Sequence, residues 1–230
     1  MNLLETKNIN YFYQDGEHRR FILRDVNTTF ERGKFYAILG QSGSGKTTFL
    51  SLLSALEVPK EGQVLYNGED IKQIGLPKYR RNSIGIVFQS YNLIPHYTAF
   101  ENVKFAMDIT DNTLPDDETT VAYNLLDFIG ITKSKADRLV TQLSGGEQQR
   151  VAIARALSTN VDLILADEPT GNLDEAIEKE IINIFKSLAR RHNKCVIVVT
   201  HSSEIAKHAD KILYLKQGSL RVLETEGQHE

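Results

Sequence analysis

Four short and nearly continuous apolar runs mark the chain at Phe35 to Leu39, Ile84 to Phe88, Leu163 to Ala166 and Val196 to Val199. Runs of this kind are typical of strands that are covered on both faces, which belong to parallel sheets in α/β proteins. Two parallel neighbours need a long crossover connection, usually a helix. The pattern therefore predicts a parallel sheet whose strands alternate with helices.

The segments between these runs carry the signals of helices and of antiparallel strands. Residues 148–157 and 177–190 have apolar positions at helical spacing and could supply the crossovers. Residues 3–30, and the segment 63–67 before the Asn67-Gly68 turn, favour antiparallel strands. We therefore expect an α/β fold with a mixed core sheet and an antiparallel flank.

A helical insert is expected to interrupt the parallel pattern. A polar, acidic stretch from Asp108 to Thr120 is followed by a helix predicted from about Val121 to Ile129, and the insert ends at a glycine-rich motif. We place the core at residues 1–89 and 159–230 and the inserted helical subdomain at about residues 90–158. A chain of 230 residues suits one such domain with a full hydrophobic core.

Composition and charge argue against several classes of protein. The net charge is −3, from 27 Lys and Arg against 30 Asp and Glu, so no broad basic surface for nucleic acid is expected. The single cysteine, Cys195, excludes an internal disulfide and opens an apolar run, where a buried thiol is expected. The first residues lack the pattern of a signal peptide, and no run of about eighteen apolar residues could span a bilayer. Any work at a membrane is therefore expected to depend on another chain.

The first chemical motif is Gly40-Gln41-Ser42-Gly43-Ser44-Gly45-Lys46-Thr47, which lies between an apolar run and the helical stretch from Thr47 to Leu56. Strand, glycine loop, lysine and hydroxyl in this order are the context of a phosphate-binding loop. Glycines let the backbone N–H groups face phosphate oxygens, and the helix N-terminus adds its positive end. Lys46 adds a charge, and Thr47 can ligate Mg²⁺. We expect this loop, with Thr48, to bind a nucleotide.

Polar side chains follow three of the apolar runs. Asp167 and Glu168 stand at the carboxyl end of a predicted strand, where open α/β sheets bind ligands. In phosphate-loop nucleotidases an aspartate there helps to hold Mg²⁺, and a second carboxylate can accept a proton from water. Gln89 could ligate a metal or position water, and His201 could contact a terminal phosphate. The alternatives are a pair of ordinary loop acids and a structural or helix-capping histidine.

A second glycine-rich motif, Leu143-Ser144-Gly145-Gly146-Glu147, precedes a helical stretch. Ser-x-x-Glu at this place is also a capping box. Both interpretations are compatible, because a capped helix still directs N–H groups and its dipole at an anion. A nucleotide has only one triphosphate, however, so two phosphate cradles in one chain do not fit a single site.

Together these motifs resemble the nucleotide-binding subunit of an ATP-binding cassette (ABC) transporter, a P-loop NTPase, over nearly the whole chain. In the family's order they match the Walker A loop (Gly40 to Thr47), the Q-loop (Gln89), the signature (Leu143 to Glu147), Walker B (Leu163 to Asp167), the catalytic base (Glu168), the D-loop (Asn172-Leu173-Asp174) and the switch histidine (His201). Tyr13 stands where the family has its adenine-stacking aromatic, although Tyr11 and Phe12 adjoin it.

The resemblance implies ATP and Mg²⁺ as ligands and an ATP-dependent head-to-tail homodimer. In such a dimer the signature of one subunit closes over the nucleotide on the Walker A loop of the other, which explains the two cradles. By resemblance, the residues that bind ATP are Tyr13, Gly40, Ser42, Gly43, Ser44, Gly45, Lys46, Thr47, Thr48, Ser144, Gly145, Gly146 and Asp174. The metal ligands are Thr47, Gln89 and Asp167, and the catalytic residues are Glu168, His201 and Gln89.

The resemblance also implies a membrane permease as partner, which would hold the chain at the cytoplasmic face of the membrane. In the family the segment after the Q-loop receives a short helix of the permease, so docking is expected near Tyr91, Leu93 and Tyr97. The alternative for this apolar segment is packing of the insert against the core.

Within the family, residues 87–95, 142–157 and 167–174 resemble the MacB/LolD group. The short insert and the stretches 33–36 and 194–201 resemble Gram-positive peptide-export ATPases of the Vex kind. The implied function is that of an ATPase subunit of an exporter for peptide, lipoprotein or drug-like substrates. A force transmitter that moves no substrate stays open as the alternative.

Other functions are less favoured. A GTPase would need Asn-Lys-x-Asp to recognise the base, but Asn193-Lys194-Cys195 is followed by Val196. ABC-type ATPases that act on DNA or ribosomes usually carry a coiled-coil insertion or a second cassette, and the sequence has neither.

Overall fold

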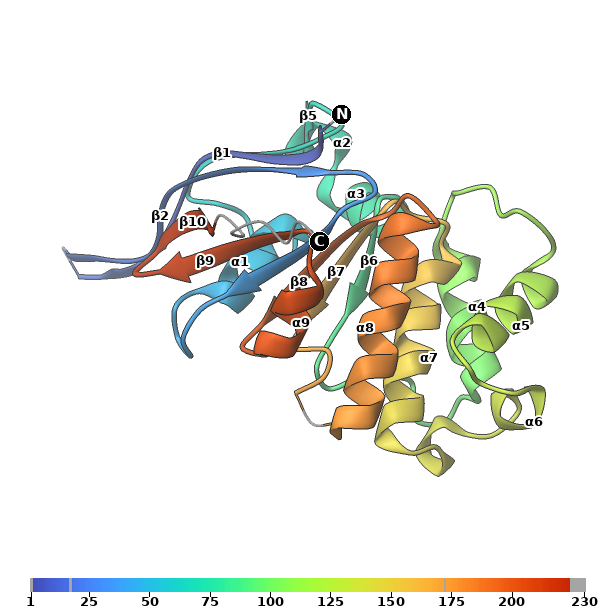
Figure 1. Ribbon diagram of the computed structural model, residues 1–230. Helices are drawn as coiled ribbons and strands as arrows, with labels where there is room; N and C mark the ends of the chain where they lie inside the picture. Colours follow the sequence, from blue (N-terminus) through green and yellow to red (C-terminus); the bar gives the residue numbers. More distant parts are fainter. Residues whose placement is uncertain (1, 17, 172, 224–230) are drawn as a thin grey trace.

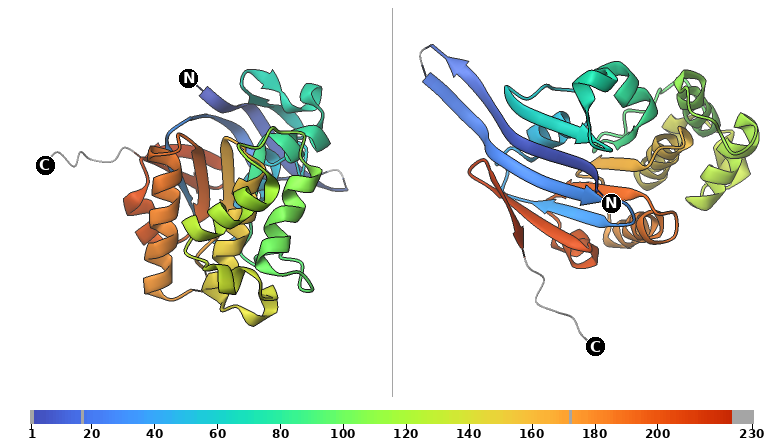
Figure 2. Two further views of the ribbon diagram at one scale, coloured as in Figure 1. Left: turned by 90° about the vertical axis from the view of Figure 1, so that its right-hand side faces the viewer. Right: turned by 90° about the horizontal axis from the view of Figure 1, so that it is seen from above.

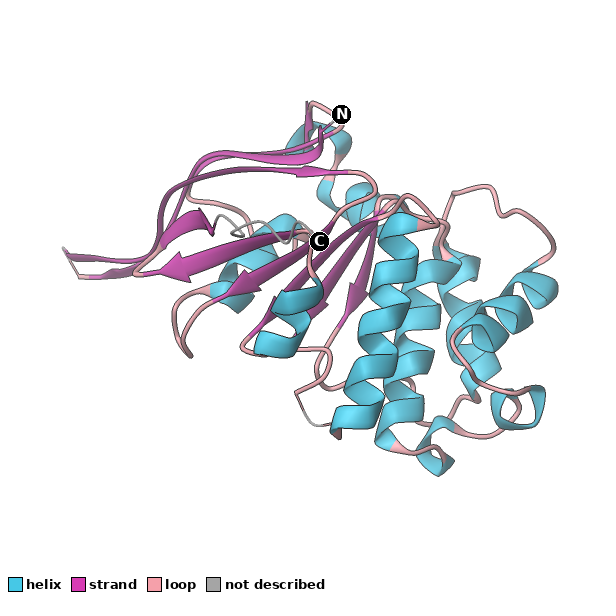
Figure 3. Ribbon diagram, in the orientation of Figure 1, coloured by secondary structure: helices cyan, strands magenta, loops and turns pink. Residues whose placement is uncertain are grey.

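The computed structural model describes residues 2–16, 18–171 and 173–223, which form two β-sheets and a set of helices (Figures 1 and 3). The strands are β1 Asn2–Asp15, β2 His18–Glu31, β3 Phe35–Leu39, β4 Glu61–Tyr66, β5 Glu69–Asp70, β6 Ile84–Val87, β7 Leu163–Asp167, β8 Cys195–Thr200, β9 Lys211–Lys216 and β10 Ser219–Leu223. The helices are α1 Lys46–Leu53, α2 Ile71–Ile74, α3 Leu76–Asn82, α4 Ala99–Ile109, α5 Glu118–Phe128, α6 Lys133–Ala136, α7 Gly145–Ser158, α8 Glu175–Arg190 and α9 Ser203–His208, with a 3₁₀ turn at Val140–Gln142.

The larger sheet has the strand order β10-β9-β3-β8-β7-β6. All neighbours in it are parallel except β9 and β10. The four apolar runs form β3, β6, β7 and β8, so the predicted parallel sheet is confirmed. Strands β9 and β10, which extend the sheet beyond β3, were not predicted from the sequence.

Both faces of the parallel sheet are buried, as the unbroken apolar runs predicted. Phe35 and Ala37 on β3 face the hydrophobic cluster that includes residues of α4, α5, α7 and α8. Tyr36 and Ile38, the alternate positions of the same strand, face a second cluster with α1 and the smaller sheet. Side chains alternate between the faces of a strand, so every residue of β3 meets a hydrophobic layer.

The smaller sheet is antiparallel, with the order β2-β1-β4-β5, and confirms the predicted flank. The long β1–β2 hairpin projects from the body at one end of the molecule (Figure 1). The helices α4, α5 and α6 lie at the opposite end, in both the front view and the view from above (Figures 1 and 2).

The helical segment between β6 and β7 contains the predicted helix as α5. It also contains α4, which was not predicted. Asp108, assigned from the sequence to a polar loop, lies in the last turn of α4. This helix starts at a capping box in which Thr98 Oγ1 accepts from Glu101 N and Glu101 Oε2 accepts from Thr98 N. No helix in the described ranges is long and apolar enough to cross a membrane. The proposed limits of the insert, about residues 90–158, stay a prediction.

Helix α7 packs so closely on β6 that one strand position must be glycine. A Cβ atom added to Gly85 would lie 2.2 Å from the carbonyl oxygen of Ala156, near the end of α7. This oxygen belongs to helix backbone and cannot rotate away. Gly85 therefore sets how near α7 can approach the sheet.

We predict that Gly85→Ala lowers the free energy of unfolding by about 1–3 kcal/mol, the usual cost of overpacking a core. Urea denaturation followed by circular dichroism measures the change. The control is Gly68→Ala in the β4–β5 turn, where φ is 85° and no atom lies within 4 Å of the added Cβ. Its cost comes from backbone conformation alone. A Gly85→Ala protein as stable as the wild type would show that α7 can move away from β6 at little cost.

Candidate active site

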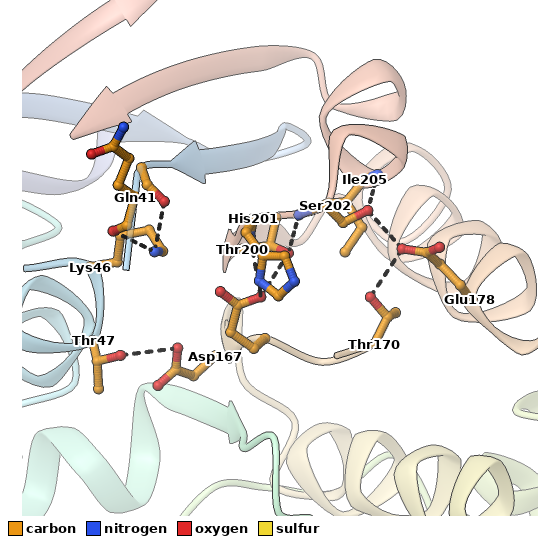
Figure 4. A network of polar contacts seen from close by, with 12 residues as sticks. Gln41, Lys46, Thr47, Asp167, Thr170, Glu178, Thr200, His201, Ser202 and Ile205 are labelled. Atoms are coloured by element: carbon orange, nitrogen blue, oxygen red, sulfur yellow. Dashed lines mark hydrogen bonds and ion pairs between the residues drawn. The ribbon is translucent and has the colours of Figure 1, made fainter. Parts of the chain in front are cut away.

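The phosphate loop joins the end of β3 to the start of α1, as the sequence predicted. Gly45 is the N-cap of α1, with φ 102°, in the left-handed region that favours glycine. No side chain caps this helix, which leaves its first N–H groups for an anion. Lys46 Nζ, which is buried, donates to the carbonyl oxygens of Gly40 at 2.9 Å and Gln41 at 3.3 Å (Figure 4). The lysine thus folds back along its own loop.

A hydroxyl and a carboxylate face each other beside this loop. Thr47 Oγ1 lies 3.4 Å from Asp167 Oδ1, across the space between α1 and the end of β7 (Figure 4). Burial raises the pKa of Asp167, and the neighbouring Glu168 charge acts in the same direction. The Thr47 hydrogen bond and the Lys46 charge oppose this shift.

These two oxygen ligands suit Mg²⁺, which is usually bound through one or two carboxylates together with substrate phosphates and water. The described part of the chain has no group of three or more His, Cys, Asp or Glu side chains placed to hold a metal ion. A magnesium ion here would complete its coordination with substrate phosphate oxygens and water.

Glu168 is held against the end of β8. Its Oε2 accepts hydrogen bonds from Thr200 Oγ1 at 3.0 Å and from His201 N at 3.2 Å, and His201 Nδ1 lies 2.9 Å away. The backbone of Glu168 has φ 44°, an unfavourable conformation for a residue with a side chain. Such strain persists only where the surroundings impose it, and here a 2.9 Å hydrogen bond joins Glu168 N to Val199 O.

A second carboxylate ties together the segments that follow Glu168 and His201. Glu178 Oε1, in the first turn of α8, accepts from Thr170 Oγ1 at 3.1 Å and from Ser202 Oγ at 2.7 Å (Figure 4). Glu178 was not predicted from the sequence, because its partners lie on two other segments. Thr200 was not predicted either, although its position directly before His201 was a signal.

Many of the residues that were predicted to bind the nucleotide or to act in catalysis line one cavity of about 610 Å³. Its lining is Ile22, Ser42, Gly43, Gly45, Lys46, Thr47, Thr48, Gln89, Glu168 and His201. Gln89 Nε2 would lie 3.1 Å from a Cβ on Gly171, so the glutamine side chain packs beside the segment after Glu168. Ile22 was not predicted, because only the fold of the β1–β2 hairpin brings it over the phosphate loop.

Tyr13 lies on the projecting hairpin and outside the lining of this cavity. Its side chain is 55 % exposed, and its ring stands edge-on to Tyr11, with 5.6 Å between the ring centroids. Tyr11 is buried, and its hydroxyl donates to Glu57 Oε2 at 3.3 Å. The pKa of Tyr11 is raised to about 12, and burial is the main cause. Of the two tyrosines, only Tyr13 has a surface free to stack on a base.

The second glycine-rich motif starts α7 and forms a complete capping box. Ser144 Oγ accepts from Glu147 N at 3.3 Å, and Glu147 Oε2 accepts from Ser144 N at 2.9 Å. A hydrogen bond from Lys135 lowers the pKa of Glu147. Among the described residues, Ser144, Gly145 and Gly146 are absent from the lining of the 610 Å³ cavity. The two glycine-rich motifs of one chain therefore do not share this cavity.

The D-loop candidates are only partly described. Asn172 lies outside the described residues. Asp174 is the N-cap of α8, where its Oδ1 accepts from Ile177 N at 3.0 Å. Its position in this structure thus has a structural explanation, and its role toward a nucleotide stays a prediction.

The predicted docking segment divides into buried and exposed parts. Leu93 is half-buried and packs against the main hydrophobic cluster, as the alternative interpretation held. Tyr97 stands edge-on to Phe105 of α4, with 5.9 Å between centroids. Phe105 is 42 % exposed and Ile109, one turn further along α4, is 53 % exposed. We call Tyr97, Phe105 and Ile109 the α4 apolar surface.

Comparison with known proteins gives a consistent picture. Residues 23–171 match the family model described as ABC transporter. The uncharacterized ABC transporter ATP-binding protein YclH of Bacillus subtilis is 47 % identical over 224 residues, covering 97 % of this chain and 98 % of that protein. The lipoprotein-releasing system ATP-binding protein LolD of Rickettsia bellii is 38 % identical, covering 96 % of this chain and 98 % of that protein.

Solved structures that are similar to this chain also include ABC transporter cassettes. The dimeric structure of the ABC transporter cassette MJ0796, from Methanocaldococcus jannaschii, matches with a TM-score of 0.88 at 38 % identity, covering 98 % of this chain and all of that chain. A second structure of MJ0796, described as a post-hydrolysis state bound to ADP and Pi, matches with a TM-score of 0.87. The chain belongs to the ABC transporter family, as one of its ATPase cassettes.

Proposed function

We propose that this cassette binds ATP with Mg²⁺, hydrolyses it with Glu168 as the general base, and drives a membrane exporter of peptide, lipoprotein or drug-like substrates. The observation that carries the chemistry is the placement of Glu168. Its carboxylate is fixed by Thr200 and His201 on the wall of the cavity that also contains Lys46 and Thr47.

Each side chain has a distinct part in the hydrolytic step. Lys46 and the N–H groups at the uncapped start of α1 bind the phosphates. Glu168 takes the proton from the water that attacks the terminal phosphorus, and His201 contacts the terminal phosphate. Thr47, Asp167 and Gln89 would hold Mg²⁺, which supplies charge neutralisation at the phosphate oxygens. Tyr13 would stack on the adenine, with little discrimination between bases.

The second cradle supports a site shared between two copies of the chain. The N-terminus of α7 would face an anion through its first N–H groups, but Gly145 and Gly146 are not in the lining of the cavity that contains Lys46. A head-to-tail dimer would place the signature of one copy over the nucleotide of the other. The relative MJ0796, whose structure is described as dimeric, supports this arrangement.

The permease is the proposed membrane partner. The α4 apolar surface exposes aromatic and aliphatic side chains of the kind that dominate binding interfaces. It adjoins the segment that follows Gln89, so a helix docked there could respond to the state of the nucleotide. The LolD relative, named as part of a lipoprotein-releasing system, supports a partner that acts on exported substrates. This position would keep the cassette at the cytoplasmic face of the membrane.

The first prediction tests the base. Glu168→Gln keeps the size of the side chain and one oxygen that can accept from Thr200 and His201, but it cannot take up the proton, so ATP turnover should fall by roughly a hundredfold or more. ATP affinity should stay near that of the wild type, and the variant should accumulate as an ATP-bound dimer in size-exclusion chromatography. Glu69→Gln, at an exposed position of β5, is the control and should hydrolyse ATP normally. Unchanged turnover in Glu168→Gln would remove Glu168 from this role.

The second prediction tests the shared site. Ser144→Arg should bind ATP as a monomer yet fail to dimerise, because the bulky cation fills the cradle offered to the other copy. It also removes the cap of α7, which costs about 0.5–2 kcal/mol of stability. Ser144→Ala is therefore the control, since it loses the cap but adds no cation, and it should still dimerise. Loss of ATP binding by the Ser144→Arg monomer would indicate a site within one chain.

The third prediction concerns the α4 apolar surface. Phe105→Asp should abolish co-purification with the permease that the wild-type chain retains, together with permease-stimulated ATPase activity. Basal hydrolysis should persist, because Phe105 is exposed. Phe128→Asp is the matched control, since Phe128 is 40 % exposed but lies on α5. Leu93→Asp is a poorer test because Leu93 packs against the core. Permease binding by Phe105→Asp equal to wild type would place the docking surface elsewhere.

A further inference from the structure

The loop that follows Gln89 has an unusual backbone. Tyr91 has φ 61° and Asn92 has φ 50°, so two successive residues with side chains occupy the left-handed region. This conformation is unfavourable for such residues and is rarely found in two neighbours. It persists only where surrounding contacts impose it. The path of the chain just after Gln89 therefore depends on what holds these two residues.

Arg155, on the third turn of α7, holds them. Its Nη2 donates to the carbonyl oxygen of Tyr91 at 2.9 Å, and its Nη1 donates to the carbonyl oxygen of Asn92. Arg155 is half-buried, and burial lowers the pKa of its guanidinium. Among the described residues no carboxylate pairs with it. The two hydrogen bonds to consecutive carbonyl groups use the planar, forked geometry of the arginine guanidinium, which a lysine cannot reproduce.

Tyr91 contacts the other end of the same helix. Its hydroxyl oxygen lies 2.9 Å from the position of a Cβ on Gly145, the first residue of α7. Gly145 and Arg155 are ten residues apart, or roughly 15 Å along a helix. Long side chains on a helix lean toward its N-terminus, so Arg155 reaches back toward Tyr91. The loop thus lies against the glycine-rich start of α7 and is hydrogen-bonded to the same helix through the Arg155 side chain.

We propose that Arg155 is a positioning residue for Gln89: by holding the Tyr91 and Asn92 carbonyl groups, it makes Gln89 move with helix α7. The proposal rests on the proposed function, because it requires that Gln89 act in hydrolysis. Any displacement of α7, such as closure of its glycine-rich end on the nucleotide of a second copy, is then passed directly to the catalytic cavity. The loop would act as a rigid link between these two places.

A kinetic comparison of variants tests the link. Arg155→Met keeps the apolar stem but removes both donors. Its kcat for ATP should fall about tenfold, while the Kd for ATP of the monomer stays within about twofold. Arg155→Lys, which can still reach a carbonyl oxygen, should recover part of the loss. The control is Arg150→Met on the same helix, because Arg150 pairs with the exposed Glu180, and it should keep wild-type kcat.

The deciding measurement is a double-mutant cycle with Gln89→Ala. If Arg155 acts through Gln89, then Arg155→Met in the Gln89→Ala background should lower kcat by less than about twofold more. Full additivity would overturn the positioning role and leave the proposed function intact. A Gln89→Ala variant with wild-type kcat would instead overturn the role of Gln89 and this inference with it. If Arg155→Met does not fold, Arg155→Lys replaces it in the same cycle, with the same two criteria.

Discussion

The pairing of β7 with β8 is the constraint on which the rest of the structure depends. Asp167 is paired with Val199, and the next residue, Glu168, donates its N–H to the Val199 carbonyl. This register places the Glu168 carboxylate beside Thr200 and His201. The same register sends alternate residues of both strands into two hydrophobic layers. A slip of one residue would exchange the layers, so the core that stabilises the fold also fixes the position of the Glu168 carboxylate.

The sequence predicted those features whose physical causes are local. Apolar runs reveal strands buried on both faces, and the glycines and lysine of the phosphate loop follow directly after one of them. The spacing of Ser144 and Glu147 predicts a capped helix, and the structure has this helix as α7. In each case the residues that determine the structure lie within a few positions of one another. The family resemblance rested on such local motifs and the comparisons bear it out.

Features that depend on distant segments were not predictable in this way. Strand β10 lies at the edge of the sheet, where most of its residues are exposed and form no continuous apolar run. The short apolar run of β9, Ile212 to Leu215, was a local signal that was missed. Ile22 reaches the cavity only because a long hairpin folds over the phosphate loop. Glu178 and Arg155 have ordinary helical surroundings in sequence, and their partners become visible only in three dimensions. The roles of the site residues in binding and hydrolysing a nucleotide stay predictions.

The contrast between the starts of α1 and α7 has a consequence for the order of events. The N-terminus of α1 has no side-chain cap, so its N–H groups have unmet hydrogen-bonding capacity that an anion can satisfy at once. At the start of α7 the Ser144 and Glu147 side chains already accept hydrogen bonds from two backbone N–H groups. A bound phosphate would therefore stabilise the start of α1 more than it would stabilise the start of α7. In the proposed head-to-tail dimer, nucleotide would therefore bind to a single chain first, and the capped helix of the other chain would then contact a site that is already occupied. Dimerisation of two chains would then depend on the bound nucleotide and would not compete with nucleotide binding.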